Sequence, residues 1–197
     1  MKPEVDVVPG RLNRDEAVIC RGEEFRIFIS EDRVLRRVAE LGRQISADYQ
    51  DKNPILIGVL NGAFIFVADL MRELSVECEI DFLKLSSYGA AKVSSGQVHE
   101  LKRIDADIHG RHVIIVEDII DTGHSMRFIR ETLLHHEPAS LRVATFLHKA
   151  EATVIDLEID YVGFVIPNRF VIGYGLDYGQ LGRNLRAVYI EAAASDS

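Results

Sequence analysis

The stretch VIIVEDIIDTGHS, residues 113–125, places three carboxylates and a Thr-Gly turn directly after four apolar residues. A turn uses polar residues and glycine, but it has no need of three acids. Gly123 permits a positive φ, and Thr122 and Ser125 supply hydroxyl groups. If a helix begins near Met126, the free amides and positive dipole end of its first turn form a cradle for phosphate. The stretch lacks the GxxxxGKS/T spacing of a nucleoside triphosphate loop, so we predict that it binds a phosphate monoester.

The acids Glu117, Asp118 and Asp121 would repel a phosphate unless they serve another part of the same ligand. Vicinal hydroxyls of a ribose need two hydrogen-bond acceptors, and a Mg²⁺ ion shared with those hydroxyls would neutralise the acid pair. An acid pair before a phosphate cradle therefore suits a ribose 5-phosphate. The alternative is that these acids are ordinary turn and helix-start residues.

Strands and helices alternate along the chain and would position these residues. Apolar runs predict strands at 25–30, 55–60, 80–85, 112–116 and 141–147. Helical spacing links the apolar residues of three further segments: Val34, Val38, Leu41 and Ile45; Phe64, Val67, Met71 and Leu74; Met126, Ile129 and Leu133. Fully apolar strands that alternate with helices indicate the α/β class, with a mostly parallel twisted sheet flanked by helices. Ligands bind beyond the carboxyl ends of such strands, where Asn61-Gly62 and residues 117–125 both fall.

Length and composition exclude several classes of protein. A chain of 197 residues with 47% hydrophobic residues suits one domain, 1–197, that buries its own core. The net charge of -8 disfavours non-specific nucleic-acid binding. No apolar run is long enough to span a membrane and no signal peptide is evident, so we expect a cytoplasmic protein. Cys20 and Cys78 lack the spacing of a zinc site or redox pair.

A long polar stretch follows the strand at 80–85. Residues 86–98 are rich in serine and glycine and predict a mobile lid, because loops of this length are usually functional or disordered. Residues 97–104 are compatible with a further strand.

The residues VEDIIDTGHSM at 116–126 resemble the signature of the type I phosphoribosyltransferases, which bind 5-phosphoribosyl 1-pyrophosphate. Four further segments are similar to the purine branch of that family, the hypoxanthine-guanine phosphoribosyltransferases: VLNGAFIFVADLMREL at 59–74, SSYG at 86–89, LHK at 147–149, and DYVGFVIPNRFVIGYGLDYGQLGRNL at 160–185. The resemblance extends from about residue 55 to the C-terminal region. It implies the type I fold, with a small hood formed by the N- and C-terminal segments.

The resemblance also implies an activity in purine salvage. The 5-phosphoribosyl group would pass from 5-phosphoribosyl 1-pyrophosphate to hypoxanthine or guanine, giving IMP or GMP and pyrophosphate, with Mg²⁺ as cofactor. It implies a homodimer or homotetramer, and no nucleic-acid or membrane partner. Two other functions stay open: a nucleotide-sensing, RNA-binding regulator on the same fold, and a transferase that prefers xanthine.

Site residues follow from the resemblance, position by position. Glu117 and Asp118 would bind the ribose hydroxyls and a metal ion. The 5-phosphate loop would consist of Asp121, Thr122, Gly123, His124 and Ser125, with Asp121 also in the position of the catalytic base. His124 stands where relatives carry a lysine or an apolar residue.

The remaining implied residues contact the purine, the pyrophosphate or the lid. Lys149 would donate to the 6-oxo group, Phe170 would stack on the base, and the Val171 backbone would read its far edge. Asp177 would hold a second Mg²⁺ beside the purine site. Pyrophosphate would meet Asn61, Gly62 and Arg183, and the lid would contribute Ser87 and Tyr88. Taken singly, Phe170 suits a core position and Lys149 a solvated one.

Overall fold

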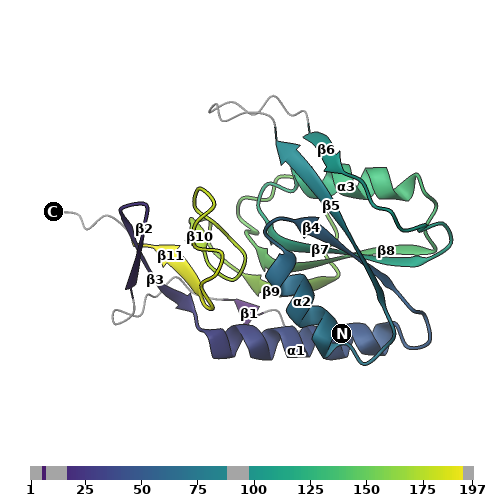
Figure 1. Ribbon diagram of the computed structural model, residues 1–197, viewed down its shortest axis with the longest axis horizontal. Coiled ribbons are helices and arrows are strands. Elements are labelled where there is room, and N and C mark those ends of the chain that lie inside the picture. Colours follow the sequence, from purple (N-terminus) through teal and green to yellow (C-terminus); the bar gives the residue numbers. More distant parts are fainter. Residues whose placement is uncertain (1–5, 8–16, 88–97, 193–197) are drawn as a thin grey trace.

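The computed structural model describes residues 6–7, 17–87 and 98–192, and these residues form two sheets and three helices (Figure 1). The main sheet has the strand order β1 (Asp6–Val7), β9 (Tyr161–Val165), β8 (Ser140–His148), β7 (His112–Ile120), β4 (Ile55–Leu60), β5 (Glu79–Ser87) and β6 (Val98–Lys102). All neighbouring strands are parallel except β5 and β6, which are antiparallel. The predicted α/β class and mostly parallel sheet are therefore confirmed.

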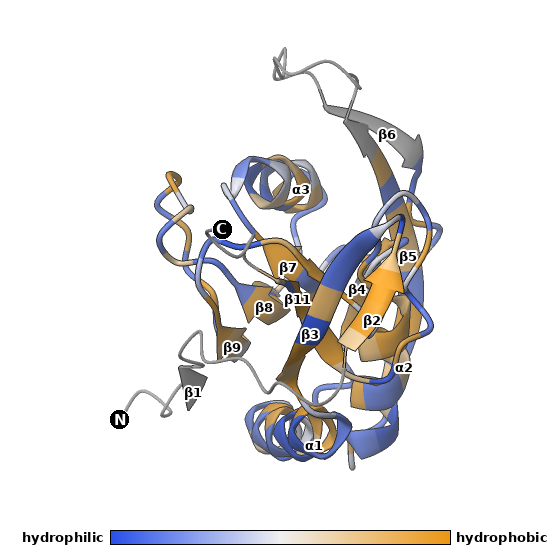
Figure 2. Cartoon of the chain, turned by 90° about the vertical axis from the view of Figure 1, so that its left-hand side faces the viewer, coloured by the Kyte–Doolittle hydropathy of each residue, from blue (hydrophilic) through white to orange (hydrophobic). Residues whose placement is uncertain are grey.

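The main sheet is covered on both faces, as its apolar strands require. Helices α1 (Glu31–Asp48) and α2 (Phe64–Glu73) share one hydrophobic cluster with Leu56, Ile114 and Val116. Helix α3 (His124–Leu134) shares the other cluster with Ile55, Ile57 and Ile115. Successive strand residues thus point to opposite faces and both are buried, which explains why the strands are apolar throughout. Figure 2 shows α3 on one side of the hydrophobic strands and α1 on the other.

The apolar faces predicted for α1 and α3 are buried. For α2 the prediction is confirmed at Val67 and wrong at Phe64. Helix α2 buries Phe66, Val67 and Leu70, whereas Phe64 is 43% exposed. Apolar residues occur on more than one side of this helix, so periodicity alone does not identify the buried side. Packing against α1 decides which side of α2 is buried. Gly42 of α1 lies so close to Glu73 of α2 that a side chain at position 42 would clash.

A second sheet forms the hood implied by the resemblance. Its antiparallel order is β10 (Val171–Ile172), β11 (Val188–Glu191), β3 (Glu23–Ile29) and β2 (Ala17–Cys20). N-terminal and C-terminal segments therefore pair side by side, at the left of Figure 1.

Strand β7 is longer than predicted. The sequence indicated a strand that ends at Val116, but pairing with β8 continues to Ile120, which lies opposite His148. Glu117 and Asp118 consequently belong to a strand and not to a loop. The suggested strand at 97–104 is present as β6. None of the described helices combines the length and hydropathy required to cross a bilayer.

Candidate active site

Glu117 and Asp118 lie near the carboxyl end of β7, where the main sheet meets its loops. Glu117 is 9% exposed. Burial raises the pKa of Glu117 well above its ordinary value, and the charge of Asp118 raises it further. Burial also raises the pKa of Asp118, although hydrogen bonds and the charge of Arg183 act in the opposite direction. Two adjacent buried carboxyl groups repel each other when ionised, so a cation or hydrogen-bond donors placed here would be strongly favoured.

The turn after β4 packs directly against this acid pair. Its peptide bond between Leu60 and Asn61 is cis. Gly62 lies so close to Asp118 that a Cβ atom at position 62 would overlap the carboxylate Oδ2 and lie 3.0 Å from Oδ1. A Cβ atom at Gly175 would in turn overlap the carbonyl oxygen of Gly62. Glycine at both positions therefore allows three segments of the chain to meet at one point.

Arg183 completes this group on the side of the hood. Its Nη2 lies 2.6 Å from Asp177 Oδ1, and its Nη1 donates to the Gly175 carbonyl at 2.7 Å. Asp177 Oδ2 also accepts a hydrogen bond from the Gln180 amide at 2.7 Å. The structure thus brings together Asp118, Gly62, Asp177 and Arg183, and it pairs the last two with each other.

The loop predicted to bind phosphate has the positive φ at its glycine and the following helix start that the sequence indicated. Gly123 has φ 88° and precedes the first residue of α3, His124. The first amides of a helix have no partner within the helix, so they are available to an anion. Beside them lies a cavity of about 100 Å³, well above the roughly 10–15 Å³ that a cavity needs to hold one water molecule. Its polar lining comes from Glu117, Asp121, Thr122, Gly123 and Ser125.

Asp121 and Lys149 form an ion pair at the edge of this loop. Lys149 Nζ donates to Asp121 Oδ2 at 2.9 Å. Lys149 is only 8% exposed, so the alternative that it is a solvated surface residue is wrong. Its backbone amide donates to the Ile120 carbonyl at 2.9 Å, which holds the end of β8 against the phosphate loop.

Phe170 lies on the hood and is 41% exposed, so its assignment to the core is also wrong. Its ring makes an edge contact with Tyr178, with centroids 5.3 Å apart, and lies 6.1 Å from the ring of Phe25. Val171, by contrast, is buried in β10 opposite Ile190. The segment that leads to Phe170 begins beside Lys149, because the Ile166 amide donates to the His148 carbonyl at 2.9 Å. Sequence reasoning did not identify Phe25 and Tyr178 as ring neighbours of Phe170. Of these two, only Tyr178 lies in a segment that the resemblance singled out.

The predicted lid is described incompletely. Tyr88 and residues 88–97 of the predicted lid lie outside the described residues, and Ser87 is described only as backbone at the end of β5. Within the described part of the chain, no cluster of three or more His, Cys, Asp or Glu side chains has the geometry of a metal site. Cys20 and Cys78 are free thiols, of which only Cys20 is buried.

Comparisons with known proteins agree with this geometry. The sequence model of the phosphoribosyl transferase domain matches residues 30–179. A hypoxanthine-guanine phosphoribosyltransferase of Streptococcus pyogenes is 44% identical over 160 residues, which cover 81% of this chain and 89% of that protein. A crystal structure of a hypoxanthine-guanine phosphoribosyltransferase from Bacillus anthracis superposes with a TM-score of 0.80 at 40% identity, covering 85% of this chain and 98% of that one. A structure of a hypoxanthine phosphoribosyl transferase of Trypanosoma cruzi gives the same TM-score and identity. The match covers 85% of this chain and 91% of that one.

The matched residues include the acid pair, the phosphate loop and the turn at Gly62, so the comparisons confirm the resemblance seen in the sequence. The chain belongs to the hypoxanthine-guanine phosphoribosyltransferase family, within the wider family of phosphoribosyl transferase domains.

Proposed function

We propose that this protein transfers the 5-phosphoribosyl group of 5-phosphoribosyl 1-pyrophosphate to hypoxanthine or guanine, giving IMP or GMP and pyrophosphate. One observation carries the proposal: the adjacent acids Glu117, which is buried, and Asp118, which is half-buried, lie between a glycine-capped helix start and the turn at Gly62. Such an arrangement offers acceptors to ribose hydroxyls, amides to a 5-phosphate and further amides to a leaving pyrophosphate. Relatives named for this activity support it.

Glu117 and Asp118 fit a Mg²⁺ ion as well as ribose hydroxyls. Burial raises both pKa values, and the charge of Asp118 raises that of Glu117 further. A hard divalent cation with oxygen ligands would stabilise the two negative charges. When bound, Mg²⁺ would neutralise negative charge on the donor and on the departing pyrophosphate. Asp177 is a second candidate ligand, but its oxygens already accept hydrogen bonds from Arg183 and the Gln180 amide. It would reach a metal ion only after that pairing opens.

Loss of pyrophosphate leaves positive charge on the ribose and negative charge on the leaving group. Arg183 and the backbone amides of the Asn61-Gly62 turn would stabilise the departing anion. These groups are held in place by the packing of Gly175 on Gly62, so little reorganisation is needed during the reaction. Asn61 carries no charge, so this stabilisation depends on the amides and on Arg183.

The purine would enter between Lys149 and Phe170. Lys149 Nζ would donate to the 6-oxo group, and the exposed ring of Phe170 would stack on the base. Asp121 would accept the proton from the purine ring nitrogen that attacks the ribose. Since Asp121 and Lys149 pair directly in the free protein, the incoming purine would insert its polar edge between two groups that already face each other. We place the lid that excludes water at residues 86–98, with Ser87 and Tyr88.

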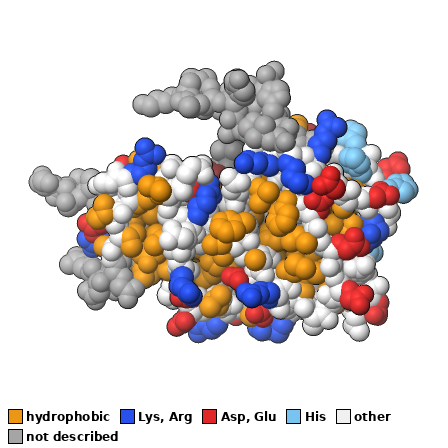
Figure 3. Space-filling view, viewed as in Figure 1, with side chains coloured by type: hydrophobic (Ala, Val, Ile, Leu, Met, Phe, Trp, Pro, Cys, Tyr) orange, Lys and Arg blue, Asp and Glu red, His pale blue; other side chains and the backbone are white. Residues whose placement is uncertain are grey.

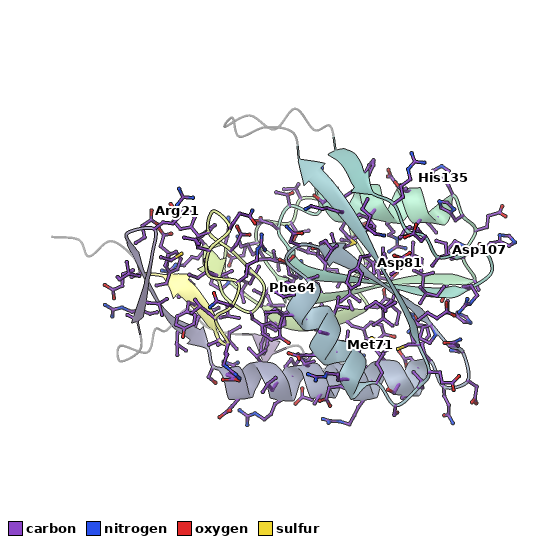
Figure 4. The ribbon with its side chains drawn as sticks, in the orientation of Figure 1. Arg21, Phe64, Met71, Asp81, Asp107 and His135 are labelled. Carbon is purple, nitrogen blue, oxygen red and sulfur yellow. The ribbon has the colours of Figure 1, made fainter. Side chains whose placement is uncertain are left out.

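An exposed apolar surface supports assembly into a homodimer or homotetramer. Phe64 of α2 is 43% exposed and Ile80 of β5 is 37% exposed. Figure 3 shows hydrophobic side chains gathered over these two elements, and Figure 4 shows Phe64 and Met71 on α2 at the front of the molecule. Replacing Phe64 with aspartate should lower the mass measured by sedimentation equilibrium if this surface lies between subunits. An unchanged mass would place the subunit contact elsewhere.

The direct test is an assay of the purified protein with 5-phosphoribosyl 1-pyrophosphate and Mg²⁺. Hypoxanthine, guanine and xanthine are supplied separately, and nucleotide formation is followed by chromatography. We expect IMP and GMP, with little product from xanthine. Absence of product with both hypoxanthine and guanine would refute the proposal, and a preference for xanthine would correct the substrate.

A further inference from the structure

The segment 149–155 lies against the phosphate loop and contains a threonine that none of the proposed roles uses. Thr153 Oγ1 lies 2.7 Å from the Asp121 carbonyl oxygen and 3.0 Å from the Lys149 carbonyl oxygen. It also lies 3.0 Å from His148 Nε2. The two residues whose side chains form the ion pair therefore have their backbone carbonyls joined by a single hydroxyl group.

The chemistry of a hydroxyl group makes this arrangement directional. A threonine hydroxyl has one hydrogen to donate and two lone pairs that accept. Burial lowers the pKa of His148, which favours its neutral ring. With the hydrogen on Nε2, the ring donates to Thr153 Oγ1, and the hydroxyl hydrogen is shared between the two carbonyl oxygens. In that tautomer, His148 holds the hydroxyl in the orientation that joins Asp121 to Lys149.

A local turn explains only part of this pattern. The bond from Thr153 to the Lys149 carbonyl spans four residues and is common where threonine follows a turn. The bond to the Asp121 carbonyl spans 32 residues and joins two different loops. One further bond joins the same loops, because the Val154 amide donates to the Thr122 carbonyl at 3.2 Å. The loops also approach closely: a Cβ atom added at Gly123 would lie 3.5 Å from the Thr153 methyl group.

We propose that Thr153 is a positioning residue, which sets the separation and relative orientation of Asp121 and Lys149 through their backbone carbonyls. This inference rests on the proposed function, because it gives Thr153 a catalytic consequence through the base and the purine donor. Thr153 itself touches no reacting atom. Its hydroxyl keeps the carboxylate of Asp121 and the ammonium of Lys149 aligned when the purine separates their side chains.

The experiment compares three variants. Thr153→Val removes the hydroxyl and keeps the shape, whereas Thr153→Ser keeps the hydroxyl and removes the methyl group. Thr132→Val is the matched control, because the Thr132 hydroxyl donates to the Phe128 carbonyl at 2.8 Å within α3, away from the proposed site. Melting temperatures and the kinetic constants for both substrates are measured for each variant.

We expect Thr153→Val to lower kcat about ten-fold, the loss typical of one positioning hydrogen bond. The KM for the donor should stay within about two-fold, because the acid pair and the turn at Gly62 make no bond to Thr153, and the Val154 amide still donates to the Thr122 carbonyl of the proposed phosphate loop. Thr153→Ser should keep most of the kcat of the parent protein, because it retains the hydroxyl group. Thr132→Val should lower the melting temperature by about as much as Thr153→Val does, and it should leave kcat unchanged. An unchanged kcat in Thr153→Val, or equal losses in the Val and Ser variants, would overturn the inference.

Amide hydrogen exchange tests the same inference without catalysis. In Thr153→Val the amides of Lys149 and Val154 should exchange faster than in the parent protein, while Thr132→Val leaves both unchanged. Unchanged exchange in Thr153→Val would show that the hydroxyl does not hold the two loops together. If the parent protein forms no nucleotide, the proposed function fails, and this measurement still decides whether Thr153 positions the loops.

Discussion

Replacing Gly62 with alanine tests the contact on which the proposed site depends. The added methyl group would overlap Asp118 Oδ2. The three heavy atoms nearest to it, Oδ2, Cγ and Oδ1, all belong to the Asp118 carboxyl group. Because favourable contacts between heavy atoms require about 3.5 Å, the carboxylate or the turn has to move by roughly 1–2 Å. Gly62 is not among the glycines with positive φ, so the expected effect is steric and does not come from backbone strain.

Overpacking of this kind costs about 1–3 kcal/mol in the free energy of unfolding. For a chain of this size, that corresponds to a fall of roughly 3–10 °C in melting temperature. The displaced carboxylate should also bind ribose poorly, so the KM for 5-phosphoribosyl 1-pyrophosphate should rise by about ten-fold or more. Calorimetry measures the first effect and steady-state kinetics the second.

A double-mutant cycle with Asp118→Ala identifies the clashing partner. Without the carboxylate, Gly62→Ala should cost less than about 0.5 kcal/mol, so the two changes should be strongly non-additive. Gly110→Ala serves as the control, because a Cβ atom there meets no other atom within 4 Å and only its positive φ of 66° is strained. Additive effects of Gly62→Ala and Asp118→Ala would refute the reasoning.

Three further predictions concern the charged residues of the site. Asp121→Asn should lower kcat at least 100-fold with little change in either KM, and an unchanged kcat would remove Asp121 from base catalysis. Lys149→Ala should raise the KM for the purine and spare binding of the donor measured by calorimetry; equal losses of both would contradict its role at the 6-oxo group. Glu117 has a raised pKa when folded, so the folded state retains the proton and the free energy of unfolding falls as pH rises above the ordinary value of 4.5. Glu117→Gln should therefore make the metal-free protein lose less stability between pH 4.5 and 8, as followed by thermal unfolding, and an unaltered pH profile would contradict this.

Much of the main sheet could be predicted from the sequence alone. The residues of β4 coincide with the apolar run at 55–60, and the buried side of α1 is the one that carries Val34, Val38 and Leu41. Burial on both faces of a parallel sheet requires apolar residues at every strand position, and that requirement is visible in a local window of sequence. The loop proposed to bind phosphate was equally visible, because Thr122, Gly123 and Ser125 all lie within one short stretch of the chain.

Other features depend on partners that are distant in sequence. Strand β7 continues past Val116 because β8 pairs with it, and Phe64 is exposed because α1 occupies another side of α2. The pairing of Asp177 with Arg183, the overlap that Gly62 avoids with Asp118, and the bond from Thr153 to Asp121 likewise arise only when separate segments meet. The sequence by itself determined the three helices, most strands of the main sheet, the family and the chemical types at the proposed site. Tertiary structure decided which of those groups face one another, because a contact between distant segments depends on how the whole chain packs and leaves no local periodic signal.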